Sequence, residues 1–298
     1  MDEEKSIIKH LVVSGGGTYG LAAYGVLREL NKKGFWSISN IKSCHATSIG
    51  SIILVMILCI HEWDTLDEFI IKRPWNNVFK FDISKIFDVF DNGGIFDKSV
   101  IFNSLKPVFL GADMEMDITM KEFYEKTGIE FYIYSVEINS FELECISHKT
   151  YPHMPLIDAC YTSCSLPILF KPLTFENKSY MDGGIFLNYP ILEFLNTMNA
   201  KPNEVLGIRK IIVDETPNSD TIQSFNLLEY VMYLLKNIMR KVNVDIDDKE
   251  NNYENEIYIH MKSITFESIS EFANSEDYRK NLITIGVEKA VEFLETHK

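Results

Sequence analysis

Short apolar runs alternate with segments of helical spacing in the first part of the chain. Residues 7–13 form an apolar run that leads into Ser14-Gly15-Gly16-Gly17, a pattern typical of a buried strand followed by a glycine turn. Apolar positions at helical spacing follow and stop near Gly34, a residue suited to a helix C-cap. Residues 41–47 predict a second strand, and an apolar helix begins near Ile49. This order predicts a parallel sheet covered by helices, which is an α/β fold.

The remaining sequence adds strands and helices without a visible linker or internal repeat. We therefore expect a single domain over residues 1–298, a three-layer sandwich with a central, mostly parallel sheet. Its motifs lie in residues 7–190, and residues 191–298 are expected to supply further helices and strands of the same domain. The predicted elements are a hairpin of residues 131–138 and 141–146, strands at 173–181 and 205–213, and helices at 156–165, 225–242 and 278–294. Helix 225–242 could be a core helix or a lid, and we expect it to pack in the core.

Charge and composition restrict the partners of this chain of 298 residues. Its formal charge of −14 repels phosphate backbones, so we expect no binding to nucleic acid. The most apolar run, residues 52–60, has about half the length needed to cross a bilayer and predicts a buried helix. The first ten residues carry acids where a secretory signal would be positively charged, and five cysteines are too few for a disulfide framework. These features favour an intracellular, cytoplasmic protein, with peripheral membrane contact left open.

The segment Gly15-Gly16-Gly17-Thr18-Tyr19-Gly20 matches G-x-G-x-x-G between a predicted strand and a predicted helix. A dinucleotide site would also need an acid about twenty residues later, at the end of the second strand. That strand ends in Ser43-Cys44-His45-Ala46-Thr47 and has no acid. No Gly-Lys-Ser/Thr follows either, which argues against a phosphate-binding loop. Two roles remain, a structural turn or a set of backbone N–H groups that stabilises an oxyanion.

A second motif, Ala46-Thr47-Ser48-Ile49-Gly50, is close to the G-x-S-x-G of a nucleophile elbow. In such an elbow the serine lies on a sharp strand-to-helix turn, and the residues two before and two after it must be small. Ala46 and Gly50 meet this need, although alanine departs from the consensus. The alternative is an ordinary helix N-cap serine.

A third motif, Asp182-Gly183-Gly184, follows predicted strand residues and precedes Asn188-Tyr189-Pro190. Alone it would indicate a turn. Together with Ser48 it offers a carboxylate as the base that a serine nucleophile requires. His260 and His297, which follow the aspartate, have no distinctive local pattern, so a Ser–Asp pair fits the sequence better than a triad.

The order of these three motifs resembles the patatin-like phospholipase family. Cys164-Ser165-Leu166-Pro167, ahead of the aspartate strand, and the Asn188 and Pro190 that follow it are similar to the family as well. The likeness runs from about residue 10 to residue 190. It implies the following roles: Ser48 as nucleophile, Asp182 as base, the amides of Gly16, Gly17 and Thr18 as oxyanion hole, and Gly15, Gly20, Ala46, Gly50, Gly183 and Gly184 as motif positions around them.

The chemistry implied by the resemblance is acyl transfer from a phospholipid or related glycerolipid to Ser48, followed by hydrolysis. No metal or organic cofactor is implied. The implied partners are a lipid substrate and a transient membrane surface, and an activating protein or lipid partner is left open. Tyr19 stands where the family usually has Arg or Lys. This departure leaves two alternatives open, a neutral-lipid esterase or thioesterase and a catalytically silent module that binds lipid or protein.

Two other groups of residues contain side chains that can bind metal ions. Five potential zinc ligands fall within twenty residues, but their spacing matches no common structural zinc site: Cys145, His148, His153, Cys160 and Cys164. The acidic residues 245–256 lack EF-hand spacing and predict a solvated loop.

Overall fold

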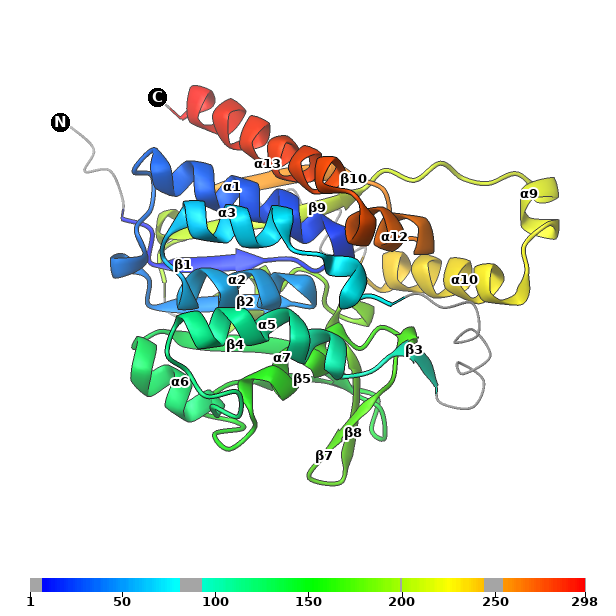
Figure 1. The fold of residues 1–298 in the computed structure, drawn as a ribbon, viewed down its shortest axis with the longest axis horizontal. Coiled ribbons are helices and arrows are strands. Elements are labelled where there is room, and N and C mark those ends of the chain that lie inside the picture. Colours follow the sequence, from blue (N-terminus) through cyan, green and yellow to red (C-terminus); the bar gives the residue numbers. More distant parts are fainter. Residues whose placement is uncertain (1–6, 81–92, 199, 244–253, 298) are drawn as a thin grey trace.

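A central sheet of eight strands organises the protein (Figure 1). The structure is a computed structural model that describes residues 7–80, 93–198, 200–243 and 254–297. The strand order is β10-β9-β1-β2-β4-β8-β7, and β5 also pairs with β4. The strands are β1 (His10–Val13), β2 (Ser43–Thr47), β4 (Glu130–Glu137), β5 (Glu142–Ile146), β7 (Leu173–Phe175), β8 (Lys178–Asp182), β9 (Val205–Ile212) and β10 (Glu256–Met261).

The sheet is mostly parallel, as predicted. β10, β9, β1, β2 and β4 pair in parallel, whereas β4 with β5, β4 with β8, and β7 with β8 are antiparallel. A separate two-stranded sheet joins β3 (Gly94–Phe96) to β6 (Ile168–Phe170). The expected α/β class is confirmed.

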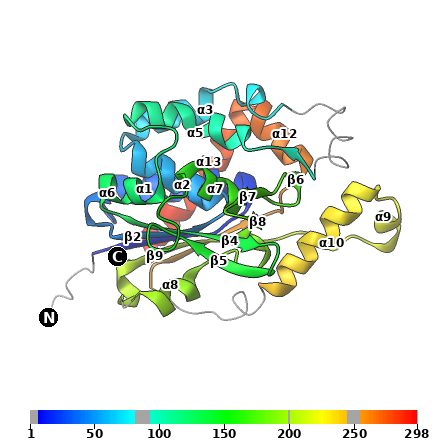
Figure 2. The ribbon, with the colours of Figure 1, turned by 90° about the horizontal axis from the view of Figure 1, so that it is seen from below.

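Helices cover both faces of the sheet (Figure 2). One face carries a thick layer that includes α1, α2, α7 and α13, and α8 lies on the other face. The helices are α1 (Gly20–Lys32), α2 (Ile49–Cys59), α3 (Trp63–Lys72), α5 (Ser99–Gly111), α6 (Met120–Thr127), α7 (Leu156–Cys164), α8 (Ile191–Thr197), α9 (Ser219–Gln223), α10 (Leu227–Val242), α12 (Phe266–Asn274) and α13 (Glu276–Thr296), with short 3-10 turns η1 (Gly17–Tyr19), η2 (Ile38–Asn40), η3 (Trp75–Asn77), η4 (Gly183–Ile185) and η5 (Pro202–Glu204).

Two glycines allow α1 and α13 to approach very closely. A Cβ at Gly25 would lie 2.2 Å from the Ile283 carbonyl oxygen, and one at Gly286 would lie 1.9 Å from the Ala22 carbonyl oxygen. Backbone therefore packs against backbone at this crossing. Because α1 directly follows the glycine-rich turn, this contact also fixes the position of that turn.

The apolar run of residues 52–60 forms most of α2, in which Gly50 to Leu58 are all buried. The prediction of a buried helix is confirmed, since α2 packs against α1, α5 and α7. Across the described residues, no helix combines the length and the apolar character that a membrane span requires.

The predicted strand at residues 173–181 is instead a hairpin of β7 and β8. Glu176 and Asn177 at its tip have φ values of 48° and 67°. Two successive residues with positive φ characterise the tight turns that join antiparallel strands. The prediction overlooked Asn177, a residue that tolerates this conformation, within an otherwise strand-like run.

Helix α10 occurs where predicted, but the expectation that it packs in the core is wrong. None of its residues is buried. Met232, Leu235 and Met239 face a cavity, and the opposite side of the helix is open to solvent. The apolar positions therefore occupy more than one side of the helix. Residues 245–253 of the predicted acidic loop lie outside the described residues, and Glu256 begins β10.

Candidate active site

Ser48 lies at a sharp turn between β2 and α2. Its backbone has φ 52° and ψ −129°, a strained combination for a residue with a side chain. Gly50 allows the turn to close, because a Cβ there would lie 2.7 Å from the Val13 carbonyl oxygen and 2.9 Å from that of Ser14. Ala46 is fully buried. The turn has the shape of a nucleophile elbow, whereas the Ser48 side chain makes no N-capping hydrogen bond.

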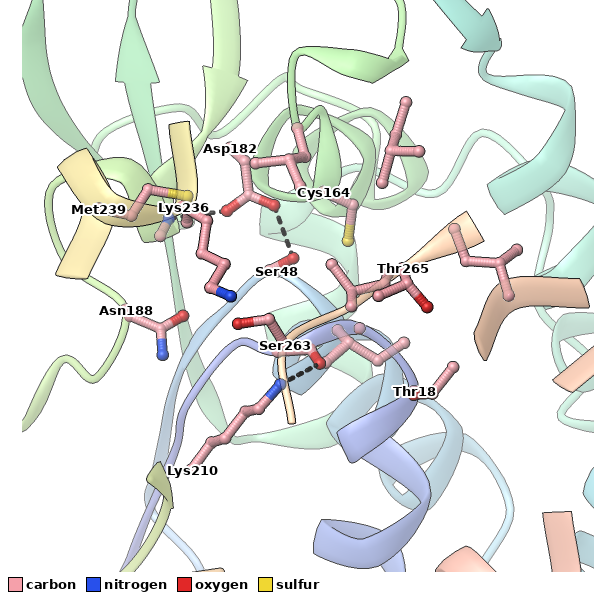
Figure 3. A pocket seen from close by; sticks show the side chains of 18 of the residues that line it. Thr18, Ser48, Cys164, Asp182, Asn188, Lys210, Lys236, Met239, Ser263 and Thr265 are labelled. Carbon is pink, nitrogen blue, oxygen red and sulfur yellow. Dashed lines mark hydrogen bonds between the residues drawn. The ribbon is translucent and has the colours of Figure 1, made fainter. Parts of the chain in front are cut away.

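Asp182 faces this serine from the end of β8. Ser48 Oγ donates a hydrogen bond of 2.7 Å to Asp182 Oδ2, and the Gly184 amide donates one of 2.7 Å to Asp182 Oδ1 (Figure 3). The carboxyl is 4% exposed. Burial raises the pKa of Asp182 to about 6, and the two hydrogen bonds oppose this rise. Above that pH the group is a carboxylate in contact with a serine hydroxyl.

Sheet register explains why two residues so far apart in sequence meet. Strand β4 lies between β2 and β8, and it pairs Thr47 with Tyr134 and Asp182 with Ser135. Ser48 directly follows Thr47, so the serine and the aspartate extend from opposite sides of the same point on β4. Neighbouring strands are about 4.8 Å apart, so β2 and β8 are separated by about 10 Å, and the two side chains meet across the end of β4.

The glycine-rich turn completes this end of the sheet. A Cβ at Gly15 would lie 3.0 Å from Ser48 Cβ, so the turn lies directly against the serine. Gly16 has φ 149° and Gly17 has φ 65°, conformations that glycine adopts most readily. No described residue accepts a hydrogen bond from the amides of Gly16, Gly17 or Thr18. All three residues line the cavity that contains Ser48 and Asp182.

That cavity has a volume of about 580 Å³ and a mostly apolar wall. Ser48, Asp182, Asn188 and Lys210 contribute polar groups to its lining, and Figure 3 shows them around the same part of the cavity. The apolar wall comes from α2, α10, β3 and β6, and from the segment before α12, with residues such as Ile52, Met56, Phe96, Leu169, Met232 and Ile264. A mostly apolar cavity with polar groups beside it is a usual form of a site for a largely apolar ligand.

Four residues that support this site were not identified from the sequence. Ser163 Oγ accepts a 2.8 Å hydrogen bond from the Ser48 amide and donates one of 2.5 Å to the Tyr134 carbonyl. Asn243, which follows α10, accepts a 2.7 Å hydrogen bond from the Asn188 amide and donates one of 3.2 Å to the Gly184 carbonyl. Lys210 donates to the Gly16 carbonyl, and Lys236 pairs with Asp214 at the cavity wall. The only sequence signal for Ser163 was its position in the serine-containing helix end before β8.

The other candidate residues lie elsewhere. No histidine lines the cavity within the described parts of the chain; His260 is an exposed residue of β10, and the His297 side chain bonds to the Phe293 and Glu254 carbonyls. Over the same residues, no group of three or more His, Cys, Asp or Glu side chains could hold a metal ion, so the five potential zinc ligands are not gathered. Cys164 lies in the cavity wall, but burial raises its pKa well above the usual thiol value and keeps it a neutral thiol.

Comparison with known proteins agrees with the fold and the motif order. Residues 11–195 match the family model described as patatin-like phospholipase. The chain is 26% identical to a probable lipid hydrolase, 463L, of Invertebrate iridescent virus 6, over 75% of this chain and 77% of that protein. It is 29% identical to triacylglycerol lipase 4 of Saccharomyces cerevisiae, over 64% of this chain but 23% of that larger protein.

Among solved structures, VipD from Legionella pneumophila superimposes with a TM-score of 0.59 at 16% identity, covering 97% of this chain and 67% of VipD. At that identity the likeness concerns the fold alone. The family model, by contrast, spans more than half of the chain and all three motifs. This chain belongs to the patatin-like phospholipase family.

Proposed function

We propose that this protein hydrolyses fatty-acyl esters of glycerolipids, with Ser48 as nucleophile and Asp182 as its base. The observation that carries the proposal is the 2.7 Å hydrogen bond from Ser48 Oγ to the buried Asp182, at a strained turn that opens into an apolar cavity. Membership of the patatin-like family and similarity to proteins named as lipid hydrolase and triacylglycerol lipase support it. We propose that the whole chain acts as one domain.

In the first half of the reaction, Asp182 accepts the hydroxyl proton of Ser48 while Oγ attacks the ester carbonyl carbon. The carbonyl oxygen becomes an oxyanion next to the glycine-rich turn. The amides of Gly16 and Gly17, with that of Thr18, are the donors proposed to stabilise it. Collapse of this intermediate breaks the bond to the alcohol, which leaves with the proton held by Asp182. The product is an acyl ester on Ser48.

In the second half, a water molecule gives its proton to Asp182 and attacks the acyl carbon through the same oxyanion intermediate. The C–O bond to Ser48 then breaks, Oγ recovers the proton and the fatty acid leaves. A pKa of about 6 suits this double role, since the group is mostly ionised at neutral pH yet holds a proton at small cost.

The cavity is proposed to hold the acyl chain. Its wall beyond Ser48 is apolar, and a chain placed there would leave the ester carbonyl between Ser48 and the glycine-rich turn. The same machinery would serve a phospholipid or a triacylglycerol, because both present a fatty-acyl ester of glycerol. A direct comparison of the two substrates is therefore part of the test.

The outer side of α10 is proposed as the contact with a lipid surface. The helix lines the cavity with one side and exposes apolar residues on the other: Leu227, Tyr230, Val231, Leu234, Ile238 and Val242. Arg240 and Lys241 lie in its last turn. An amphipathic helix with apolar and basic residues of this kind is suited to lie in a membrane interface. In Figures 1 and 2 it projects at the edge of the molecule.

The test is fatty-acid release from phosphatidylcholine and from a triacylglycerol in mixed micelles, with Ser48→Ala and Asp182→Asn as matched variants. We expect release by the wild type and a loss in both variants of about 100-fold or more, since a positioned general base alone contributes about 100- to 10,000-fold. A folded wild-type protein that releases no fatty acid from either lipid would contradict the proposal and favour a catalytically silent lipid- or protein-binding module.

A further inference from the structure

Lys210 is a buried lysine whose ammonium group contacts the glycine-rich turn. It lies on β9, next to β1, and is only 6% exposed. Its Nζ donates a hydrogen bond of 3.2 Å to the Gly16 carbonyl oxygen, and its backbone amide donates one of 2.9 Å to Ser14 Oγ. A Cβ at Gly16 would lie 2.6 Å from Lys210 Cδ, so the aliphatic stem packs along the turn. Figure 3 shows the side chain reaching toward the end of the cavity that holds Ser48.

The contact constrains the direction of one amide. A trans peptide bond is planar and points its C=O and N–H in opposite directions. When Lys210 holds the Gly16 carbonyl, the N–H of Gly17 must therefore point away from the lysine. A cation on the carbonyl also draws electron density through the peptide group and strengthens the N–H as a donor. Gly17 has φ 65°, so its flexible backbone needs an external restraint to stay in one orientation.

The loop itself supplies no such cation. Tyr19 is fully buried and is not among the residues that line the cavity, whereas Gly16, Gly17 and Thr18 are. Lys236 on α10 also lines the cavity, but it is paired with Asp214, which in turn accepts hydrogen bonds from Ser263. Lys210 of β9 supplies a cation that bonds to the turn, at the Gly16 carbonyl.

We propose that Lys210 is a positioning residue that orients the Gly16–Gly17 peptide as an oxyanion donor, a role supplied from β9 rather than from within the glycine-rich loop. The inference rests on the proposed function of Ser48. It assigns to Lys210 no contact with the substrate: the lysine acts through the peptide group that it holds. Its loss should therefore slow the chemical step and leave substrate binding largely unchanged.

The pH dependence of the reaction offers an independent readout. Burial lowers the pKa of Lys210 to about 8, an effect that Lys236 on α10 reinforces and Asp214 after β9 opposes. Tyr19 of η1 also packs against Gly16 and stays neutral, because burial raises its pKa above the usual range. Lys210 thus loses its charge as the pH rises through about 8. Asp182, with a pKa of about 6, loses its proton at lower pH.

The experiment measures kcat and KM for a soluble p-nitrophenyl acyl ester from pH 5 to pH 10. The variants are Lys210→Met, which keeps an apolar stem but no charge, and Lys210→Arg, which keeps the charge. Lys106→Met is the matched control, because Lys106 is an exposed lysine of α5 that does not line the cavity. Circular dichroism and thermal unfolding establish that each variant is folded. Lys210→Gln, an uncharged donor, replaces Lys210→Met if the latter does not fold.

We expect Lys210→Met to lower kcat by about 10- to 100-fold with KM changed less than about threefold, a smaller loss than the 100- to 1000-fold that follows removal of an oxyanion donor itself. Lys210→Arg should recover most of kcat and remove the decline above pH 8, and Lys106→Met should match the wild type. A Lys210→Met enzyme with wild-type kcat, or equal losses in Lys210→Met and Lys210→Arg, would overturn the inference while the function of Ser48 stands. A wild type without esterase activity would instead overturn both proposals.

Discussion

Ser163 holds the Ser48 turn in place, and its removal should both destabilise the protein and reduce the reactivity of the serine. The Ser163 hydroxyl is fully buried and bridges two backbone groups, accepting from the Ser48 amide at 2.8 Å and donating to the Tyr134 carbonyl at 2.5 Å. In Ser163→Ala the Ser48 amide loses this partner, and Tyr134 loses one donor. A buried amide left unsatisfied costs about 1–3 kcal/mol, and loss of the second bond adds about 1 kcal/mol.

We therefore expect Ser163→Ala to lower the free energy of unfolding by about 2–4 kcal/mol, which corresponds to about 3–6 °C in Tm for a domain of 298 residues. The backbone of Ser48 is also strained, at a cost of about 1–3 kcal/mol. In the wild type, the hydrogen bond from the Ser48 amide to Ser163 helps to offset this cost. The turn should relax, and the rate of Ser48 modification by a fluorophosphonate should fall at least about tenfold, since small displacements of reacting groups are costly.

Ser165→Ala is the matched control for this prediction. Ser165 lies just after the same helix, is equally buried, and its hydroxyl bonds to the Tyr161 carbonyl at 2.7 Å, whereas the Ser48 amide bonds to Ser163. Its loss should cost about 1 kcal/mol and leave labelling of Ser48 unchanged. Equal stability and equal labelling rates for wild type and Ser163→Ala would refute the reasoning, because the bridge would then contribute nothing to the turn.

Three further predictions follow from the same geometry. Burial raises the pKa of Asp182 from 3.8 to about 6, so its contribution to the free energy of unfolding is present below pH 4 and is lost as the pH rises through 6. Asp182→Asn should therefore increase the free energy of unfolding at pH 7.5, by up to about 3 kcal/mol, but not at pH 4. Thermal unfolding at the two pH values measures this difference. A Cβ at Gly50 would overlap the Val13 carbonyl, so Gly50→Ala should destabilise the protein by about 1–3 kcal/mol in a denaturant titration, and an unchanged midpoint would contradict the overlap. The double variant Leu234→Asp, Ile238→Asp on the exposed side of α10 should reduce sedimentation with liposomes while cleavage of a soluble ester is retained. Wild-type liposome binding by that variant would exclude this side of α10 as the membrane contact.

The sequence predicts those parts of the fold that depend on local pattern. Apolar runs ending in glycine predict β1, β2 and the buried α2 because a buried parallel strand or helix needs continuous apolar residues. The depth of α10 is not predictable in this way. Its apolar residues face a cavity on one side and solvent on the other. The sequence shows that these residues recur at helical spacing, but it does not show which parts of the protein pack against them.

For the site, the sequence supplies Ser48, Asp182 and the glycine-rich turn because each carries a short motif. The supporting residues Ser163 and Lys210 have no local pattern. Their roles depend on strand register and helix packing, which bring residues 163 and 210 to within hydrogen-bond distance of residues 48 and 16. Such contacts across the sheet are determined by the whole fold and not by a stretch of neighbouring residues.

The most direct test of the central claim is intact-mass detection of a fluorophosphonate adduct on the purified protein, measured beside Ser48→Ala and Asp182→Asn. We expect a single adduct on the wild type, located at Ser48, none on Ser48→Ala, and a labelling rate on Asp182→Asn reduced by about 100-fold or more. An unlabelled but folded wild type, or an adduct that persists on Ser48→Ala, would contradict the assignment of Ser48 as the activated nucleophile.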